Sequence, residues 1–348
     1  MGGGERRRAR LHPDHGGRVH PFARAARLPS TRRRRDRGRA GELNESAAET
    51  APVGLADDDL PAAFRAADRT AIASQARTMR WLGWQLALLV LAAIFGVIPG
   101  DIGDLRVGPL LALVVFAVAV ILSWRVASEA PSAEWYRGRA GAESVKTLAW
   151  RYAVCGDPFV SNLTRREVDL LFEERLSDVI NGLEELDWRY LGEGEEITDR
   201  MREIRASGLD ERKRGYETGR LRDQQAWYAR KSEFNRRRSE QWGWAAVGAT
   251  VIGFIGAVLR IPTDWGVDVD LLGIAATFAA AVAAWTQSKQ FRVLTTSYAV
   301  TAHELATIIS IRLPLVEKEE DWAGFVREAE SAISREHSLW LARRGAAG

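Results

Sequence analysis

The chain has little of what enzymes and metalloproteins use for chemistry. It has 348 residues but a single cysteine, Cys155, which excludes an internal disulfide framework and a cysteine-based zinc site. Three of its five histidines lie near the N-terminus, and the remaining two, His303 and His337, are too far apart to show metal-ligand spacing. No P-loop, G-x-G-x-x-G or H-E-x-x-H motif occurs. We therefore expect no enzyme activity, no metal and no cofactor.

Charge is missing from four long apolar runs. These are Trp81–Ile98, Val107–Trp124, Trp242–Leu259 and Leu271–Trp285. Each of the first three is about long enough to cross the ~30 Å hydrocarbon core of a bilayer. The fourth is the shortest, and it needs additional residues from Val267–Val269 or from Thr286–Ser288 to cross the bilayer.

The connectors within each pair of runs are short and polar. They are Gly100–Arg106 and Arg260–Asp270, so the four runs form two hairpins. The alternative is a soluble helical protein with two buried hairpins. Helices of a soluble core usually keep a polar stripe, whereas these runs are apolar all round, which favours the membrane. The sequence thus predicts an all-α membrane protein: two transmembrane helical hairpins, four spans in all, with long cytoplasmic helical extensions.

The charges that flank the spans predict the orientation of the chain. Basic residues stand beside the spans on the side of the termini and of the middle segment: Arg77, Arg80, Arg125, Arg137, Arg139, Arg236, Arg237, Arg238, Lys289 and Arg292. The two connectors hold one arginine each, Arg106 and Arg260, against five aspartates. By the positive-inside rule, both termini and the middle segment face the cytoplasm, and the chain crosses the membrane several times. Tryptophans lie at the span ends, where indole prefers the interface: Trp81, Trp84, Trp124, Trp242, Trp244, Trp265 and Trp285.

The N-terminal segment from Met1 to Gly41 carries 13 arginines and no lysine. Such a segment is expected to be disordered. One interpretation is an arm that binds nucleic acid or anionic lipid, since clustered arginines neutralise phosphates. The other, which we favour, is a dispensable tail or sequence translated upstream of the true start. We accordingly do not expect nucleic acid as a partner.

Helices are expected throughout the segments outside the spans. Amphipathic or continuous patterns cover Leu60–Arg80, Ser132–Val154, a helix opened by a capping box at Thr164 and Glu167, Ile197–Ala206, Leu221–Gln241 and Trp322–Arg343. Leu221–Gln241 continues into the third span, and Leu271–Leu313 has no proline and no glycine after Gly273. The second hairpin should therefore stand on two long helical stalks.

A weak internal repeat relates the two halves of the chain at one constant offset. It relates Trp81 to Trp242, Trp124 to Trp285, Glu143 to Glu304, and Arg151 to Arg312. Each half would then be one unit made of an incoming helix, a hairpin and an outgoing helix. A parallel duplication of this kind differs from the inverted repeats common in transporters.

Small residues form stripes on the third and fourth spans. They are Ala245, Ala249, Gly253 and Ala257 on the third, and Ala276, Ala280 and Ala284 on the fourth. Such stripes let helix backbones approach closely. We expect them to serve helix packing, either between copies in a homo-oligomer or within one subunit.

Two polar faces are candidates for coupling between the cytoplasmic part and the spans. Arg139, Glu143, Lys146 and Trp150 share a helix face, as do Asp223, Trp227, Lys231 and Asn235. The plainer alternative is a pair of solvated ion-pair ladders. The complete candidate network is Trp135, Tyr136, Arg139, Glu143, Lys146, Trp150, Arg151, Asp223, Gln224, Trp227, Tyr228, Lys231, Asn235, Glu304 and Arg312.

These stretches also carry a family resemblance. The pattern W-Y-x-x-R-A-x-A-E-S-x-K-x-x-A-W-R, Trp135 to Arg151, follows a two-helix hairpin and resembles the SLATT family of SMODS and SLOG-associating two-transmembrane effector domains. The pattern D-Q-x-x-W-Y-x-x-K-x-x-x-N, Asp223 to Asn235, and the end from Glu328 to Trp340 resemble a second SLATT subtype. The resemblance divides the chain into a tail (1–56), a first unit (57–190), a linker (191–220) and a second unit (221–345).

The resemblance implies a membrane effector of a bacterial nucleotide-signalled conflict system. In that picture a separate nucleotide-synthesising or nucleotide-sensing protein triggers the hairpins to form an oligomeric pore or to perturb the lipid bilayer. The alternative is a non-conducting, membrane-anchored scaffold that binds a cytoplasmic partner.

Overall fold

The computed structural model describes residues 54–102, 105–129, 131–182, 194–261 and 270–345. All of them belong to one unit that extends from Thr50 to Gly348. Trp265 and Val267–Val269 lie outside the described residues, as do the Arg-rich tail and most of the second connector.

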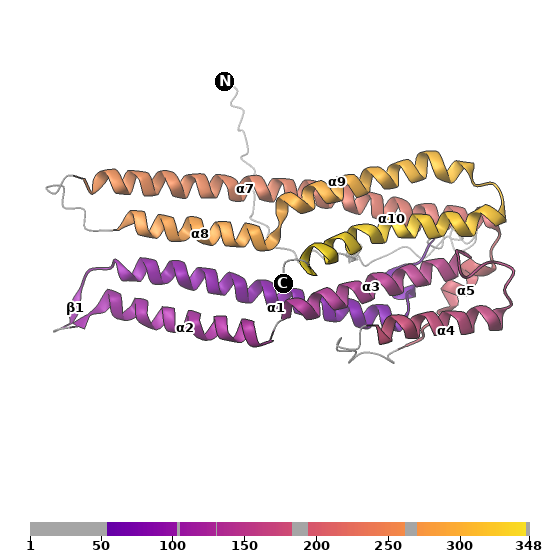
Figure 1. Ribbon diagram of the computed structural model, residues 1–348, viewed down its shortest axis with the longest axis horizontal. Coiled ribbons are helices and arrows are strands. Elements are labelled where there is room, and N and C mark those ends of the chain that lie inside the picture. Colours follow the sequence, from indigo (N-terminus) through magenta and orange to yellow (C-terminus); the bar gives the residue numbers. More distant parts are fainter. Residues whose placement is uncertain (1–53, 103–104, 130, 183–193, 262–269, 346–348) are drawn as a thin grey trace, which may run out of the picture. The chain divides into compact units, whose positions relative to one another are not determined.

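The described residues are helical apart from short turns and one small hairpin (Figure 1). The first half contains η1 (Asp57–Asp59), α1 (Ala62–Gly96), β1 (Asp101–Ile102), β2 (Leu105–Arg106), α2 (Val107–Glu129), α3 (Pro131–Ala153), α4 (Arg165–Asn181), α5 (Asp199–Ala206) and α6 (Leu209–Tyr216). The second half contains η2 (Glu217–Arg222), α7 (Asp223–Leu259), α8 (Leu271–Lys289), α9 (Phe291–Thr307), η4 (Ile308–Arg312), η5 (Leu313–Leu315) and α10 (Glu319–Gly345).

Four of these helices are long and apolar enough to cross a membrane, which confirms the predicted fold class. The first connector, which the sequence shows only as short and polar, contains a short antiparallel pairing in which Asp101 faces Arg106. The fourth span extends at its C-terminal end, since α8 continues through Thr286–Ser288 to Lys289. The helix therefore has 19 residues, which is about the length needed to cross a bilayer. The apolar run alone is too short for this.

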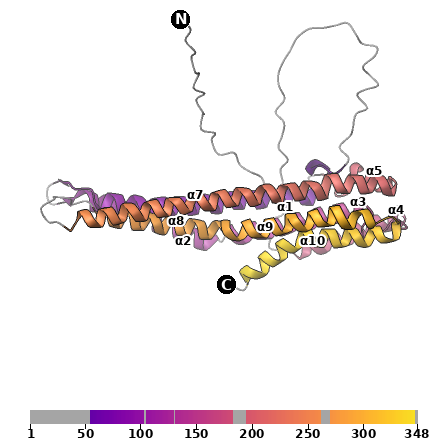
Figure 2. The same cartoon turned by 90° about the horizontal axis from the view of Figure 1, so that it is seen from above.

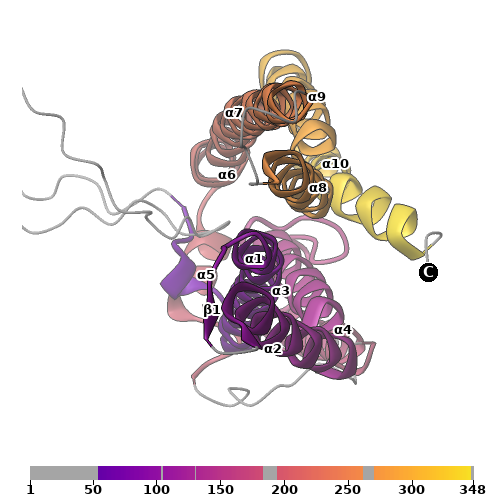
Figure 3. The ribbon, with the colours of Figure 1, turned by 90° about the vertical axis from the view of Figure 1, so that its left-hand side faces the viewer.

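The two halves repeat the same arrangement of helices. α1 begins at Ala62 and α7 at Asp223, which keeps the offset that relates Trp81 to Trp242 in the sequence. In each half the incoming helix packs against both following helices: α1 against α2 and α3, and α7 against α8 and α9. The end-on view shows each incoming helix beside its partners (Figure 3). α1 also contacts α8, which joins the two hairpins.

The sequence explains where the helices begin and end. Thr164 Oγ1 accepts a hydrogen bond from the Glu167 backbone N–H, and the Glu167 carboxylate accepts one from the Thr164 N–H at 2.9 Å, so the predicted capping box opens α4. Pro131 starts α3, because proline fits the first turn of a helix but cannot continue one. The predicted stalk is also confirmed: α7 continues unbroken from Asp223 into the third span (Figure 2).

The expectation of an equally unbroken helix from Leu271 to Leu313 is wrong. Gln290 adopts a left-handed conformation with φ of 52°, which ends α8 and begins α9. A left-handed residue cannot continue a right-handed helix, whatever the local helix propensity. The chain steps sideways at this point, as the ribbon shows (Figure 1).

Burial separates the spans from the rest of the described residues. We call residues 54–80, 131–241 and 290–345 the helical base, within the described ranges. The largest fully buried side chains, Trp150 and Trp322 among them, all lie in the base. In the spans, by contrast, Leu113 is 66% exposed and Phe254 is 68% exposed. Exposed apolar surface on this scale indicates contact with lipid.

Close packing of α1 on α3 depends on Gly138. A Cβ atom at this position would lie 2.9 Å from the Ala71 backbone nitrogen and 3.1 Å from the Ala67 carbonyl oxygen. We expect Gly138→Ala to lower the free energy of unfolding by about 1–3 kcal/mol, because the helices must move apart. Denaturation of the purified protein in detergent would measure this. Gly243→Ala is the matched control: nothing lies within 4 Å of its Cβ position, so it should raise stability by about 0.5–1 kcal/mol.

Candidate functional site: a buried ionic centre in the helical base

The helical base encloses an arginine with two carboxylates. Arg220 Nη2 lies 3.0 Å from Glu143 Oε1 and 2.8 Å from Glu330 Oε2, and the side chains of Arg220 and Glu330 are fully buried. Arg220 Nε donates a second hydrogen bond to Glu330 Oε1 at 3.0 Å. We call Arg220, Glu143 and Glu330 the ionic centre.

Two hydroxyl groups donate further hydrogen bonds to the Glu330 carboxylate. Tyr216 donates to Glu330 Oε1 at 2.9 Å, and Thr147 donates to Glu330 Oε2 at 2.9 Å. Each carboxylate oxygen of Glu330 therefore accepts from both a hydroxyl and the guanidinium. Such charge-assisted bonds are the strong ones, and here they offset the cost of burying the charges.

The centre joins elements that are distant in the sequence. Glu143 and Thr147 lie on α3, Tyr216 ends α6, Arg220 lies on η2, and Glu330 lies on α10. η2 is a π-helical turn, in which an extra residue widens the helix; such turns are frequent at functional sites. The centre thus ties the outgoing helix of the first half to the last helix of the second, at the junction between the halves.

Electrostatics keep the centre ionised. Burial alone would raise the pKa of Glu143, but Arg220 and Lys146 outweigh that cost, so the pKa lies below its usual value. Burial likewise disfavours the charged guanidinium of Arg220, yet Glu330 and Glu143 raise its pKa. Tyr216 stays neutral, because burial and the neighbouring Glu330 raise its pKa well above 10.0. Tyr216 is consequently a fixed hydrogen-bond donor.

The lowered pKa of Glu143 predicts how stability depends on pH. A carboxylate whose folded-state pKa is depressed stabilises the protein above its unfolded-state pKa, and this contribution disappears as the pH falls through the folded-state value. We expect the melting temperature to fall below about pH 4.5, the ordinary value for glutamate. Melting curves of wild type and Glu143→Gln between pH 3 and pH 7 would test this. With falling pH, the melting temperature of wild type should drop more steeply than that of Glu143→Gln, and the difference is the contribution of Glu143. Identical slopes for the two proteins would contradict this contribution.

Several predicted network residues surround the centre. Lys146 is buried, and its Nζ lies 3.0 Å from Asp57 Oδ1. Trp150 is buried edge-on against Tyr216, with ring centroids 5.8 Å apart. Arg151 is half-buried and donates to the Arg327 carbonyl at 3.5 Å. One face of α3 therefore supplies Glu143, Lys146 and Trp150 to the interior, and this part is not a solvated ladder.

The second predicted face forms an aromatic cluster between α7 and α9. Tyr298 on α9 has ring centroids 5.5 Å from both Trp227 and Tyr228. Lys231 Nζ lies over the Trp227 ring at 5.7 Å. Burial lowers the pKa of Lys231, and the nearby cations Arg139 and Arg230 lower it further. Arg139 and Lys231, from the two predicted faces, are thus close enough to interact.

The remaining members of the predicted network are placed as follows. Trp135 and Tyr136 stack on each other with centroids 4.7 Å apart. Asn235 is buried and donates to the Lys231 carbonyl at 2.7 Å, Gln224 is buried, and Asp223 is half-buried. Glu304 is half-buried on α9, and Arg312 forms an exposed ion pair with Glu328. The repeat therefore does not duplicate the centre: Arg220 pairs with Glu143, and the equivalent Glu304 lies elsewhere.

The small-residue stripes have different surroundings. Ala249 and Gly253 are buried, and a Cβ at Gly253 would lie 3.2 Å from Ala275 Cβ on α8, while Ala245 and Ala257 are half-buried. On α8, Ala275 and Val282 are the buried residues. Ala276 and Ala280 are exposed and Ala284 is half-buried. The third-span stripe thus packs within the subunit, and the fourth-span stripe faces outward.

Sequence reasoning missed Arg220, Glu330, Tyr216 and Thr147. Arg220 stands just before the Asp223 motif, and Glu330 lies within the C-terminal stretch that carries the family resemblance. Their separation of 110 residues gave no periodic signal that could pair them. A charged residue in an otherwise apolar face of the last helix was the available hint.

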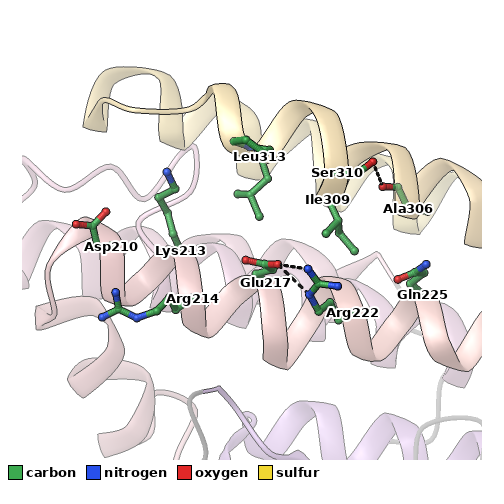
Figure 4. A pocket seen from close by; sticks show the side chains of 11 residues that line it. Asp210, Lys213, Arg214, Glu217, Arg222, Gln225, Ala306, Ile309, Ser310 and Leu313 are labelled. Carbon is green, nitrogen blue, oxygen red and sulfur yellow. Dashed lines mark hydrogen bonds and ion pairs between the residues drawn. The ribbon is translucent and has the colours of Figure 1, made fainter.

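A groove of about 620 Å³ lies beside η2, between this turn and the facing helical segment around η4 (Figure 4). Lys213, Arg214 and Arg222 line it together with Asp210 and Glu217, and η4 forms the opposite wall. Arg222 Nη2 bonds Glu217 Oε1 at 2.6 Å within it. Among the described residues no cluster of side chains has the composition of a metal site.

Together the four spans and the base define a class: a multi-pass helical membrane protein built from two hairpins. Family comparison gives the particular family. Residues 61–213 match SMODS and SLOG-associating 2TM effector domain 3, and residues 216–340 match SMODS and SLOG-associating 2TM effector domain 1. The chain therefore belongs to the SLATT family and carries two tandem domains of different subtype, as the motifs predicted. No curated protein and no solved structure matches it significantly.

Proposed function

We propose that this protein is a non-enzymatic membrane effector of a bacterial nucleotide-signalled conflict system, which assembles into homo-oligomers and forms a pore or perturbs the membrane when triggered. One observation carries the proposal: the ionic centre lies at the junction of the two SLATT domains, directly below α7. η2, which holds Arg220, leads without a loop into α7 and so into the third span. A displacement at η2 would thus be transmitted along one rigid helix.

The trigger acts on the base, because the spans hold no charged group that a signal could use. A separate protein that makes or senses a nucleotide supplies it. The groove beside η2 offers cations and carboxylates on its walls. Oligomers form through the lipid-facing surface, where Ala276 and Ala280 are exposed on α8. Both termini and the base lie in the cytoplasm, and the spans cross the inner membrane.

Induced expression in bacterial cells, followed with a membrane-potential dye, tests this function. We expect wild type to depolarise the cells when the trigger system is present, and the purified chain to release dye from liposomes. Ala280→Leu should reduce leakage, because it blocks close helix approach on the lipid-facing side. Phe278→Leu, a conservative change at another exposed α8 position, is the control. Absence of leakage with the trigger present would contradict a pore.

The alternative function is a non-conducting scaffold. It is favoured by the polar groups of the spans being satisfied internally: Gln85 Nε2 donates to Ser123 Oγ at 2.9 Å, and Thr250 and Thr277 bond carbonyls of their own helices. These side chains then offer no polar path through the described part of a single copy. Lys231→Glu that abolishes partner binding while membrane conductance stays at the empty-vector level would support the scaffold; Arg230→Glu on the same helix is its exposed control.

A further inference from the structure

A second groove lies where the second hairpin meets the helical base. Its volume is about 520 Å³, and α7 contributes Trp242, Gly243 and Ala246 to its walls. The other wall comes from both sides of the α8–α9 break, with Val282 and Thr286 before Gln290 and Val293 after it. The left-handed Gln290 thus creates the groove, because it moves α9 out of line with α8. Strained backbone of this kind concentrates at functional sites.

The groove lies at the level of a membrane interface. Trp242 and Trp285 face each other from the two helices, with ring centroids 6.3 Å apart. Tryptophan pairs at span ends mark the headgroup level. Toward the spans the lining is apolar, with Ala246, Val282 and Ala283. Toward the base it combines the polar Ser239, Gln290 and Arg292 with the apolar Phe291 and Val293. An apolar end, and an opposite end that offers polar and charged groups, match the acyl chain and the headgroup of a phospholipid.

The charges beside the groove complement a phosphate. Arg292 lines it and is exposed, and its guanidinium bonds no other side chain among the described residues. Arg236 and Arg237 are exposed one turn below Ser239; both pair with Glu233, and Arg236 also pairs with Glu240. Counting Lys289, Arg292 and residues 233–241, this rim holds five cations and two carboxylates. An anionic headgroup is therefore favoured over a zwitterionic one.

We propose that this groove is a binding site for one anionic phospholipid, with an acyl chain between α7 and α8 and the phosphate at Arg292. The site depends on membrane insertion of the spans and not on the effector role, so a protein that never leaks dye could still bind the lipid. The lipid fills the gap that the break at Gln290 opens, and so holds α9 against the stalk of α7.

Native mass spectrometry of the purified full chain in detergent tests the proposal, with phosphatidylglycerol and phosphatidylcholine as probes. Wild type should retain one phosphatidylglycerol per chain and bind it more tightly than phosphatidylcholine. Arg292→Gln should reduce that preference about fivefold, the equivalent of the ~1 kcal/mol that a basic residue contributes near an anionic surface. Arg125→Gln, a juxtamembrane arginine at the end of the second span, should leave it unchanged.

A variant that fills the groove provides a second, independent test of the lipid site. Gly243 lines the groove and nothing lies within 4 Å of its Cβ position, so Gly243→Leu fills the groove without disturbing the fold. We expect it to weaken phosphatidylglycerol binding at least tenfold. Gly248→Leu is matched, since Gly248 lies on the same helix with equally open space and does not line the groove.

Three results would overturn the site. They are retention of the lipid by Gly243→Leu at the wild-type level, equal affinity of wild type for the two lipids, and a change in oligomer mass rather than lipid count in Gly243→Leu. The last would identify the groove as a contact between copies of this chain.

Discussion

Replacing Arg220 with methionine is expected to lower the free energy of unfolding by about 3–5 kcal/mol, one of the largest effects of any single substitution in this protein. The guanidinium is the shared partner of two buried carboxylates, Glu143 and Glu330. Without it, Glu330 keeps only hydroxyl donors, and Glu143 keeps only the weaker influence of the neighbouring cations Lys146 and Arg139. Chemical denaturation in detergent, followed by tryptophan fluorescence, would measure the loss.

Two further variants separate loss of charge balance from loss of packing. Arg222→Met removes an arginine of the same π-helical turn that is exposed and pairs with Glu217, so its effect should stay within about 0.5 kcal/mol. Adding Glu143→Gln and Glu330→Gln to Arg220→Met removes the uncompensated charges, and part of the stability should return. A triple variant no more stable than Arg220→Met would show that packing, and not charge, dominates.

Trp322→Ala is the second substitution with a large expected effect, again about 3–5 kcal/mol. The indole is fully buried, stands perpendicular to Tyr216 and stacks on Phe325. Its Nε1 donates a hydrogen bond to the Val154 carbonyl at 2.6 Å. This bond connects α10 to the C-terminal end of α3. Alanine leaves a cavity and a buried carbonyl without its donor.

Trp322→Phe provides the comparison, because it keeps most of the volume but loses the donor. It should cost about 1–3 kcal/mol, less than alanine. Limited proteolysis adds a structural readout: α10 should become susceptible in Trp322→Ala while the α7–α8 hairpin stays protected. Equal stability of wild type and Trp322→Ala would show that α10 does not contribute to the base.

The parts of the fold that follow from local rules could be predicted from the sequence. Charge-free runs of membrane length gave the four spans, and the Thr164 capping box gave the start of α4. The continuity of α7 followed from the absence of proline and glycine before Gly243. Each of these features depends on neighbouring residues, so that a single sequence contains the information.

Features that depend on tertiary contacts could not be predicted. Gln290 has no sequence signature of a left-handed residue, since glycine or asparagine usually occupies such positions. Glu143 was identified by its spacing from Lys146 and Trp150, but its partner Arg220 lies 77 residues away. Periodicity shows that a set of residues shares one face of a helix. It does not show which distant residues pack against that face.

The position of Glu330 on the final helix has a consequence for biosynthesis. Arg220 and both hairpins are translated before Glu330, which follows Arg220 by 110 residues. Membrane insertion of the spans can therefore begin on the ribosome while Glu143 and Arg220 are still without their third partner. The ionic centre is complete only when the last helix has been released, so a prematurely terminated chain would leave both hairpins in the bilayer with Glu143 and Arg220 but without Glu330.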